Sequence, residues 1–203
     1  MTRIVLVRHG HVEGIEPERF RGRADIPLSE LGHKQAAAVA ARIAAFWRPV
    51  RIFTSPLGRA RDTGSAIGQA TGAPCEIQEG LGDIDYGQWQ WKTHEEVRAA
   101  EPALYDLWYA EPHLVRFPGG EALQDVVART ADVVRAMRER FPGQTVVLVG
   151  HDSVNRALLL QLLDQPLSAY WRLAQSPCGI SEIEFDVGPA RVLRVNETAH
   201  LEV

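Results

Sequence analysis

The stretch Ile4-Val5-Leu6-Val7-Arg8-His9-Gly10 decides the fold. Its first four residues form a short aliphatic run, which is typical of a strand buried on both faces of a parallel sheet. The run stops at an arginine, a histidine and a glycine, so polar side chains follow the strand directly. In open α/β sheets, ligands bind beyond the carboxyl ends of the strands. This stretch therefore predicts both a sheet and the edge of the sheet where a site lies.

Two other strands are predicted to end in the same way. The apolar run Thr145–Val149 is followed by a glycine and His151. The short strand expected over Arg51–Thr54 leads into a helix that carries Arg59 near its start. Because parallel strands end at one edge of a sheet, we expect His9, Arg59 and His151 to lie close together.

The segments between the strands show the 3.6-residue spacing of apolar side chains that is typical of helices. Ser29 is a predicted N-cap, Pro102 interrupts one helical segment, and Gly188-Pro189 favours a hairpin near the C-terminus. The element order is β-α-β-α-β-α-α-β-α-β-β. This order predicts an α/β fold, a three-layer α/β/α sandwich with a mostly parallel sheet and an antiparallel edge strand. We find no repeat or linker and expect a single domain over residues 1–203.

Composition excludes several classes of function. The chain has 203 residues, 45% of them hydrophobic, and a net charge of −4, which argues against nucleic acid or an anionic membrane as a partner. No apolar stretch reaches the roughly 18 residues of a membrane-spanning helix. Cys75 and Cys178 form neither a disulfide framework nor a zinc pattern. We therefore expect a cytoplasmic protein with no metal and no cofactor.

The residues expected at the sheet edge suit a phosphoryl group. Arginine guanidinium groups match phosphoryl oxygens bidentately, and a neutral imidazole is a nucleophile that can attack phosphorus. Taken singly, each residue has an ordinary structural explanation, since most isolated histidines and helix arginines are not catalytic. Arg61, which points to another face of the helix than Arg59, is interpreted as a surface residue.

Four ordered segments carry a resemblance to a known family. Leu6–Gly10 is similar to the opening motif of the histidine phosphatase superfamily, which includes the cofactor-dependent phosphoglycerate mutases. Phe20–Ser29, Ser55–Thr63 and Leu148–His151 resemble the second, third and fourth motifs, so that the likeness covers nearly the whole chain. One such motif would be a weak signal, whereas four in the right order are a strong one.

The resemblance implies a role for each matching residue. His9 is expected to be the nucleophile and to carry a transient phosphohistidine. Arg8, Arg59 and His151 are expected to hold the phosphoryl oxygens. The family places a glutamate general acid in the segment that here reads Leu81–Gly87, and Asp83 occupies the position of that glutamate.

An aspartate is one methylene shorter than a glutamate, so its reach toward the leaving group differs. Glu79 and Asp85 are the alternative general acids, Glu79 being the stronger of the two because of its longer side chain. All three acidic residues can equally be read as a solvated acidic loop.

Departures from the family pattern concern substrate recognition. The residues expected to contact substrate are Gly10, Arg21, Gly22, Glu79, Arg116 and Asp152. Arg21 replaces a common glutamine and makes the pocket mouth more cationic, and Asp152-Ser153 replaces a pair of small residues. His11 either lines the entrance or is exposed. The aromatic residues of this region are expected to be mostly core, with one or two lining the pocket: Phe20, Tyr86, Trp89, Trp91, Trp108 and Phe117.

The predicted function is metal-independent hydrolysis of a small phosphorylated metabolite. A phosphoglycerate mutase activity is the first alternative, and a catalytically inactive, phospholigand-binding protein is the second. Mutases of this family are usually longer, and the short region between Trp91 and Gly120 predicts an open site that admits water and favours hydrolysis. A homodimer is compatible with the sequence, which does not identify the substrate.

Overall fold

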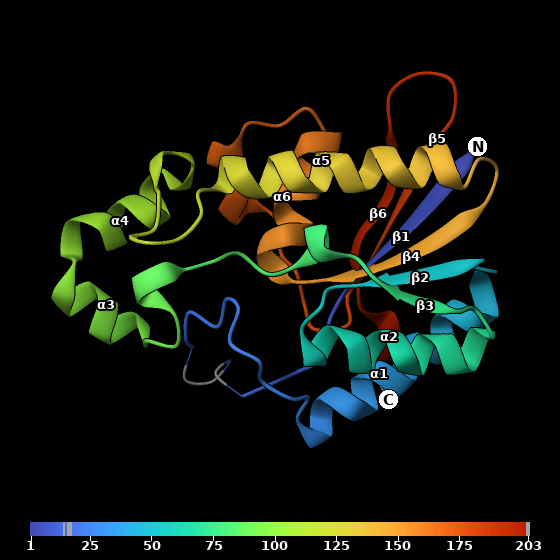
Figure 1. The fold of residues 1–203 in the computed structure, drawn as a ribbon, viewed down its shortest axis with the longest axis horizontal. Coiled ribbons are helices and arrows are strands. Elements are labelled where there is room, and N and C mark those ends of the chain that lie inside the picture. The colour runs from blue at the N-terminus through green and yellow to red at the C-terminus, as the bar shows by residue number, and fades with distance from the viewer. Residues whose placement is uncertain (14, 16–17, 202–203) are drawn as a thin grey trace.

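The computed structural model describes residues 1–13, 15 and 18–201 (Figure 1). A six-stranded sheet in the order β3-β2-β4-β1-β5-β6 forms the centre of the molecule. The strands are β1 (Thr2–Arg8), β2 (Arg51–Thr54), β3 (Cys75–Ile77), β4 (Thr145–Gly150), β5 (Ile180–Phe185) and β6 (Arg191–Glu197). The pairs β3-β2, β2-β4 and β4-β1 are parallel, whereas β1-β5 and β5-β6 are antiparallel.

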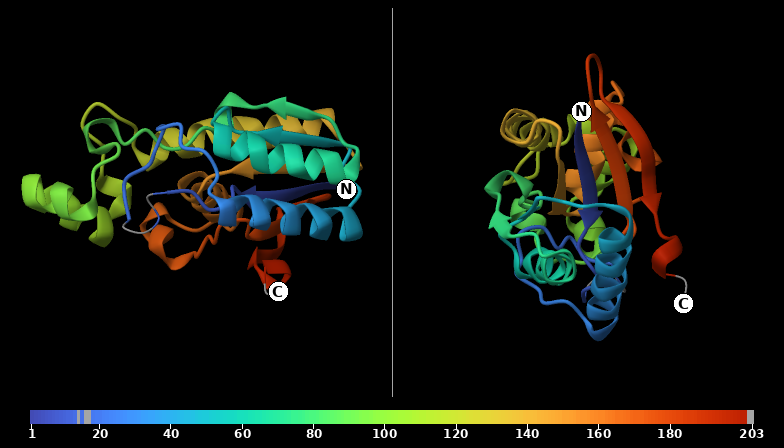
Figure 2. Two further views of the ribbon diagram at one scale, coloured as in Figure 1. Left: turned by 90° about the horizontal axis from the view of Figure 1, so that it is seen from below. Right: turned by 90° about the vertical axis from the view of Figure 1, so that its right-hand side faces the viewer.

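Helices cover both faces of this sheet, as the end-on view in Figure 2 shows. The α-helices are α1 (Glu30–Phe46), α2 (Gly58–Thr71), α3 (His94–Ala100), α4 (Pro102–Ala110), α5 (Leu123–Arg140) and α6 (Asp152–Leu162). Short 3₁₀ turns are η1 (Glu79–Leu81), η2 (Gly87–Trp89), η3 (Pro112–Leu114), η4 (Leu167–Arg172) and η5 (Ala199–Leu201). None of the helices in the described part of the chain is long and apolar enough to cross a membrane.

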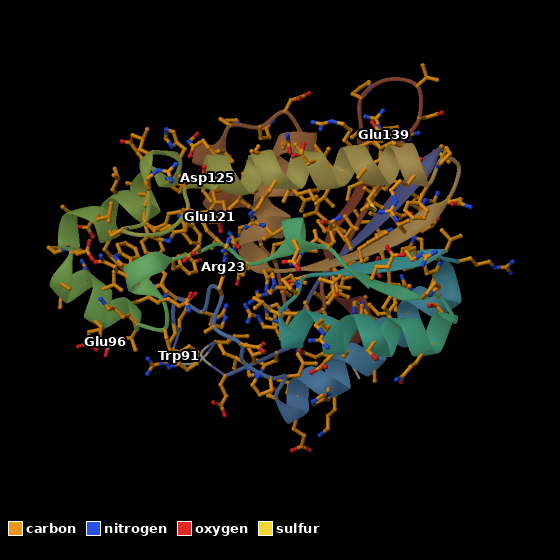
Figure 3. All side chains as sticks on the ribbon, in the orientation of Figure 1. Arg23, Trp91, Glu96, Glu121, Asp125 and Glu139 are labelled. Atoms are coloured by element: carbon orange, nitrogen blue, oxygen red, sulfur yellow. The ribbon has the colours of Figure 1, made fainter. Side chains whose placement is uncertain are left out.

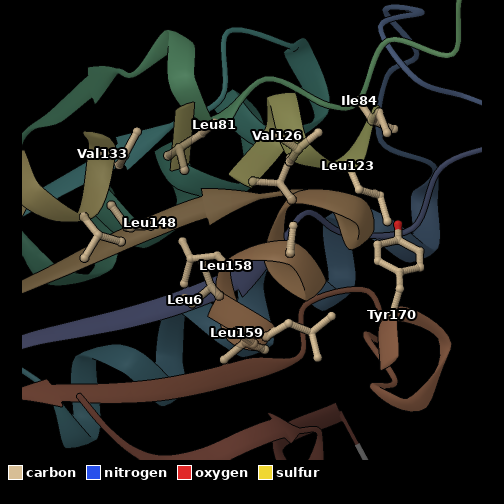
Figure 4. Packing of buried hydrophobic residues seen from close by; sticks show 14 of the residues in the cluster. Leu6, Leu81, Ile84, Leu123, Val126, Val133, Leu148, Leu158, Leu159 and Tyr170 are labelled. Atoms are coloured by element: carbon tan, nitrogen blue, oxygen red, sulfur yellow. The ribbon is translucent and has the colours of Figure 1, made fainter. Parts of the chain in front are cut away.

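The alternation of side chains along β1 divides the core into two layers. Ile4 and Leu6 pack with residues of α5 and α6, a cluster seen at close range in Figure 4. Val5 and Val7 belong to a second cluster with residues of α1 and α2. All four side chains are fully buried, each contributing about 1.5–3 kcal/mol relative to exposure. The central strand thus fixes both helical layers and, with them, the edge at which it ends.

The predicted fold class is confirmed, whereas the element order differs in one place. The segment predicted as one helix interrupted by Pro102 forms two helices, α3 and α4, so that three helices instead of two lie between β3 and β4. The sheet differs in one further detail. The antiparallel part of the sheet consists of two strands, β5 and β6, instead of one edge strand. Local signals also act as predicted: the Ser29 side chain accepts a hydrogen bond from the Gly32 backbone N–H and caps α1, and Pro102 opens α4 after the end of α3. Beyond the sheet, α3 and α4 form a separate projection at the left of Figure 1.

Candidate active site

The ends of three parallel strands bring the predicted residues together. Arg8 at the end of β1 is in register with Gly150 at the end of β4, and Thr54 at the end of β2 is in register with Val149. Beyond the strands the pairing continues, since the His9 backbone N–H donates to the Gly150 carbonyl at 3.0 Å. The residues that follow the three strands therefore start from one edge, as the sequence predicts.

His9 is held through one ring nitrogen, and its other ring nitrogen faces Arg59. Its Nδ1 lies 2.7 Å from the Gly10 carbonyl oxygen, and the imidazole is almost entirely buried. A carbonyl oxygen can only accept, so we assign the ring hydrogen to Nδ1. This tautomer leaves a lone pair on Nε2, which is the atom that can attack an electrophile.

Arg59 lies beside that nitrogen and is completely buried. Its Nε is 3.3 Å from His9 Nε2, and its Nη2 donates to the Gly22 carbonyl at 2.7 Å and to Asp83 Oδ2 at 3.0 Å. Nη1 donates to the Ala24 carbonyl at 2.6 Å. The segment predicted as the second motif thus supplies backbone acceptors that fix the guanidinium against the nucleophile.

The start of α2 is held by the same segment. The Gly58 backbone N–H donates to Asp25 Oδ1 at 2.9 Å, which caps a helix whose own N-cap residue makes no side-chain bond. Further along, the Thr63 hydroxyl donates to the Arg59 carbonyl at 2.8 Å and accepts from the Gly10 backbone N–H at 3.1 Å. These bonds connect the helix that carries Arg59 to the loop that carries His9.

His151 faces His9, with their ring centroids 5.0 Å apart. Its Nε2 lies 2.7 Å from Ser55 Oγ, which fixes the ring. Its buried Nδ1 makes no hydrogen bond to any described residue and lies 3.5 Å from Asp83 Oδ2. An unpaired buried ring nitrogen is costly, so a ligand oxygen at this position stabilises the site.

Arg8 is the fourth member of the cluster and is 6% exposed. Its Nη1 donates to the Gln175 carbonyl, whereas its buried Nε is without a hydrogen-bond partner among residues 1–13, 15 and 18–201. Two buried cationic side chains and two imidazoles therefore lie at one edge of the sheet, with Arg59 and His151 next to His9. Such a set binds a compact anion with several oxygens.

Burial and these cations also set the protonation of the histidines. Burial lowers the pKa of His9 well below its usual value, and the positive charges of Arg59 and Arg8 lower it further. The pKa of His151 is lowered for the same reasons. Both imidazoles are neutral at physiological pH, which is the form in which His9 has a nucleophilic lone pair.

Asp83 is the acidic residue that the fold brings to this cluster. Its side chain contacts Arg59 through Oδ2, and its Oδ1 accepts from the Ile84 backbone N–H at 2.9 Å. Glu79, the alternative acid, is exposed on η1 and does not line the pocket that contains His9 and Asp83. Asp85 faces away and accepts from the Gly87 backbone N–H.

The loop that carries Asp83 is fixed from behind by an ion-pair network. Arg129 on α5 donates to the carbonyls of Gly80 and Gly82 at 2.8 and 2.6 Å and pairs with Glu121 at 3.0 Å. Arg23 reaches the same glutamate at 3.4 Å, and Figure 3 shows the two residues side by side. The position of the acid therefore depends on α5 as well as on its own loop.

Two glycines of the predicted site are required by close backbone approach. A Cβ on Gly10 would lie 2.6 Å from the Gly32 carbonyl oxygen, so this residue allows the loop to pack on α1. Gly22 has φ +46° and a Cβ there would meet the Ile84 carbonyl at 2.9 Å. Both glycines help to place His9 and Arg59. Gly22 also lines the pocket that contains His9, whereas Gly10 packs on α1.

The remaining predicted substrate residues divide into two groups. Arg21 and Asp152 line the pocket together with His9. Arg116 does not reach it, because the exposed side chain pairs with Asp125 at 3.0 Å at the start of α5. His11 lies outside the pocket as well, with Nδ1 2.8 Å from Ser29 Oγ.

The far wall of the pocket contains residues that sequence patterns did not single out. They are Glu18, Arg19, His94, Tyr170 and Trp171. Ser153, which follows Asp152 in the sequence, lines the pocket as well. Of the predicted aromatic residues, Phe20, Tyr86 and Trp108 line the pocket, whereas Trp91 is 40% exposed. The segment that sequence predicted as an open region thus supplies two helices whose side chains form one wall of a narrow pocket.

The site has the composition of a phosphoryl-binding centre and not of a metal centre. Among the described residues, no group of three or more His, Cys, Asp or Glu side chains is placed to hold a metal ion. Two buried guanidinium groups supply positive charge next to a neutral imidazole and a carboxyl group. The fold and the site therefore define an enzyme that acts on phosphoryl groups.

Comparison with known proteins identifies the family. The sequence model of the histidine phosphatase superfamily (branch 1) matches residues 4–198. Phosphoserine phosphatase 1 of Hydrogenobacter thermophilus is 34% identical over 201 residues, which cover 99% of this chain and 95% of that protein. Glucosyl-3-phosphoglycerate phosphatase of Mycolicibacterium vanbaalenii is 36% identical over 178 residues, covering 82% of this chain and 76% of that protein.

A solved structure agrees with these sequence matches. Bacillus stearothermophilus YhfR superposes with a TM-score of 0.94 at 31% identity, with all of both chains covered. The chain belongs to the histidine phosphatase superfamily, and it is a phosphomonoester hydrolase. The resemblance seen in the four motifs is confirmed.

Proposed function

We propose that this phosphatase hydrolyses a small phosphomonoester in two steps through a phosphohistidine on His9. The observation that carries the proposal is the geometry at His9. Nδ1 is engaged by the Gly10 carbonyl, and Nε2 lies beside Arg59 in a buried pocket. The nucleophile, the positive charge and the carboxyl group of Asp83 are thus within reach of one bound phosphoryl group.

In the first step, His9 Nε2 attacks phosphorus, and the bond from phosphorus to the leaving oxygen breaks. Arg8, Arg59 and His151 bind the three phosphoryl oxygens and stabilise the charge on them in the transition state. Asp83 supplies the proton that the departing alkoxide takes up. Alkoxides are poor leaving groups, and such proton donation contributes about 100- to 10,000-fold to the rate.

In the second step, water attacks the phosphohistidine while the Asp83 carboxylate accepts a proton from it. The N–P bond breaks, and its electron pair returns to Nε2 as phosphate is released. The buried arginines supply the charge stabilisation that a metal ion provides in other phosphatases. Activity is therefore expected to persist in EDTA.

The substrate that we propose carries a second anionic group, such as a carboxylate, close to the phosphate ester. The related enzymes are named for phosphoserine and glucosyl-3-phosphoglycerate, both of which have this arrangement. In this chain, Arg21 and His94 line the pocket that contains His9 and Asp83. We place the enzyme in the cytoplasm, where its two unpaired cysteines stay reduced.

Rapid-quench trapping tests the phosphohistidine. Incubation with a ³²P-labelled phosphomonoester is expected to give an acid-labile, base-stable phosphoprotein and free phosphate. His9→Ala is expected to abolish the label and to lower kcat/KM by at least about 1000-fold. The matched control is His33→Ala, which removes an exposed histidine from α1. Wild-type turnover by His9→Ala would contradict the proposal.

The same experiment separates hydrolysis from the two alternatives. A mutase returns the labelled phosphoryl group to a phosphoglycerate, whereas a phosphatase releases one phosphate for each ester cleaved. A protein that only binds phospholigands forms no labelled intermediate. We expect stoichiometric phosphate release and no isomerised phosphoglycerate.

A further inference from the structure

Ser153 is a buried hydroxyl group in direct contact with Asp83. It lies in the first turn of α6, two residues after His151, and is 2% exposed. Its Oγ donates a hydrogen bond to Asp83 Oδ1, and the Ile84 backbone N–H lies 3.4 Å from the same Oγ. Ser153 and Asp83 line the same pocket as His9.

The two oxygens of Asp83 have different partners. Oδ2 accepts from Arg59 at 3.0 Å and lies 3.5 Å from His151 Nδ1, so it faces the groups that hold the phosphoryl oxygens. Oδ1 faces Ser153. A guanidinium can only donate, whereas a hydroxyl can donate and accept at the same time. The Ser153 side is therefore the one through which Asp83 can pass a proton.

We propose that Ser153 relays the proton between Asp83 and the leaving oxygen of the substrate, an inference that rests on the proposed function. When Asp83 is protonated, its Oδ1–H donates to Ser153 Oγ, and the serine hydroxyl hydrogen turns toward the pocket. As the P–O bond breaks, its electron pair remains on the leaving oxygen, which takes the Ser153 proton. Ser153 takes the Asp83 proton in the same step.

The relay leaves Ser153 neutral and Asp83 as a carboxylate, and the second step runs it in reverse. Water loses a proton to Ser153 Oγ as Ser153 returns its own proton to Asp83. One hydroxyl group inserted between acid and substrate offsets the missing methylene of the aspartate. It also explains why a hydroxyl residue stands where the family pattern has a small one.

A comparison of substrates whose leaving groups do and do not need a proton tests this relay. Ser153→Ala is expected to lower kcat/KM about 100-fold for alkyl phosphates, which need a proton, and less than about 3-fold for 2,4-dinitrophenyl phosphate, which does not. Ser153→Thr keeps the hydroxyl and is expected to stay within about 5-fold of wild type on both substrates. An equal loss on both substrates by a folded Ser153→Ala variant would overturn the proposal.

Ser55→Ala is the matched control within the same site. Ser55 is fully buried, and its Oγ lies 2.7 Å from Nε2 of His151. Within the described part of the chain, no hydrogen bond joins Ser55 to Asp83. Loss of Ser55 weakens phosphoryl binding and is expected to lower kcat/KM for all leaving groups alike. The contrast between the two serines separates proton transfer from general damage to the pocket.

A proton inventory distinguishes a relay from mere positioning of Asp83. In mixtures of H₂O and D₂O, kcat/KM for an alkyl phosphate is expected to fall along a curve, because two protons move in one transition state. A straight line would overturn the relay. Asp83→Asn tests the proposed function separately: it is expected to show the same leaving-group selectivity as Ser153→Ala. If Asp83→Asn lacks that selectivity, Asp83 is not the general acid and the proposed function fails at this residue. If Asp83→Asn shows the selectivity and Ser153→Ala does not, Asp83 remains the general acid and only the relay through Ser153 is refuted.

Discussion

The phosphoryl clamp and the opposite wall of the pocket are built in different ways. The clamp consists of Arg8, His9, Arg59 and His151, which follow the ends of three adjacent strands. The opposite wall, which we call the leaving-group wall, consists of Phe20, Arg21, His94, Trp108, Tyr170 and Trp171. These residues come from loops, from α3 and α4, and from η4. Under the proposed function, the sheet positions the reacting groups, and segments outside the sheet contact the rest of the substrate.

The two regions also differ in the contacts that hold their side chains in place. In the clamp, Arg59 has four hydrogen-bonding neighbours at fixed positions, and a change of one side chain affects the others. The leaving-group wall is held by aromatic contacts, such as Tyr109 stacked on Trp171 at 5.0 Å and His94 stacked on Phe20 at 4.4 Å. Such contacts tolerate substitution better than a buried ionic cluster.

Arg59 and Arg61 provide the sharpest test of the clamp, because they are two residues apart on α2. Arg59→Ala removes a charge that binds the transition state and is expected to lower kcat/KM about 1000-fold. Arg61 is exposed, and Arg61→Ala is expected to stay within about 2-fold of wild type. Steady-state kinetics and circular dichroism measure activity and folding. Comparable losses of kcat/KM in Arg59→Ala and Arg61→Ala would show that the buried position of Arg59 gives it no special role in activity.

The buried histidines of the clamp are also expected to make stability depend on pH. In the unfolded chain a histidine titrates near 6.5, whereas in the folded protein the pKa values of His9 and His151 lie well below that. Below about pH 6.5 the unfolded state therefore binds more protons than the folded state. The free energy of unfolding is therefore expected to fall as the pH is lowered below about 6.5, by up to about 1.4 kcal/mol per pH unit for each histidine.

Denaturant unfolding at pH 5.5 and pH 7.5 measures this effect. From pH 7.5 to pH 5.5, the free energy of unfolding of His9→Asn is expected to fall less than that of wild type. The variant lacks one of the two histidines whose pKa differs between the folded and unfolded states. His33→Asn, which changes an exposed histidine, is expected to keep the wild-type difference. An unchanged pH dependence in His9→Asn would show that the folded protein binds the proton at His9 as readily as the unfolded chain does.

The clamp was predictable from sequence because its signals are local. An aliphatic run marks β1 and β4, and the residues after each run lie at the sheet edge whatever the details of packing. The cap at Ser29 and the break at Pro102 are equally local. The pairing of β5 with β1 is not, since it joins residues about 180 positions apart, and the hairpin signal at Gly188 says nothing of which strand lies next to it.

The leaving-group wall gave fewer such signals. Arg21 was predicted to contact substrate, and Phe20 and Trp108 were among the aromatic candidates, whereas His94, Tyr170 and Trp171 were not predicted. Tyr170 and Trp171 stand in an irregular segment, and only the tertiary fold brings that segment next to Asp83. The three acidic residues of the Glu79–Asp85 loop look alike in sequence. They differ in the structure because Arg59 and Ser153 contact Asp83, whereas Glu79 stays exposed. Arg116 was misplaced for a related reason, since Asp125 binds it on the outside of the fold.

His94 gives the smallest expected effect and tests the leaving-group wall directly. Its Nδ1 lies 2.8 Å from the Tyr109 hydroxyl, and its ring stacks on Phe20. His94→Phe keeps the aromatic stacking and removes the polar ring atoms. We expect the KM for a carboxylate-bearing phosphomonoester to rise about 3- to 10-fold, because one polar contact is worth about 0.5–1.5 kcal/mol.

The kcat for p-nitrophenyl phosphate, which has no carboxylate, is expected to stay within about 2-fold in His94→Phe. Glu95→Ala, a change at the exposed neighbouring residue, is the control and is expected to alter neither substrate. A fall in kcat on both substrates would place His94 with the clamp. A change in KM alone, confined to the carboxylated substrate, would show that His94 acts in substrate recognition and not in the chemical step. Recognition would then belong to the segments outside the sheet, and the chemical step to the residues at the sheet edge.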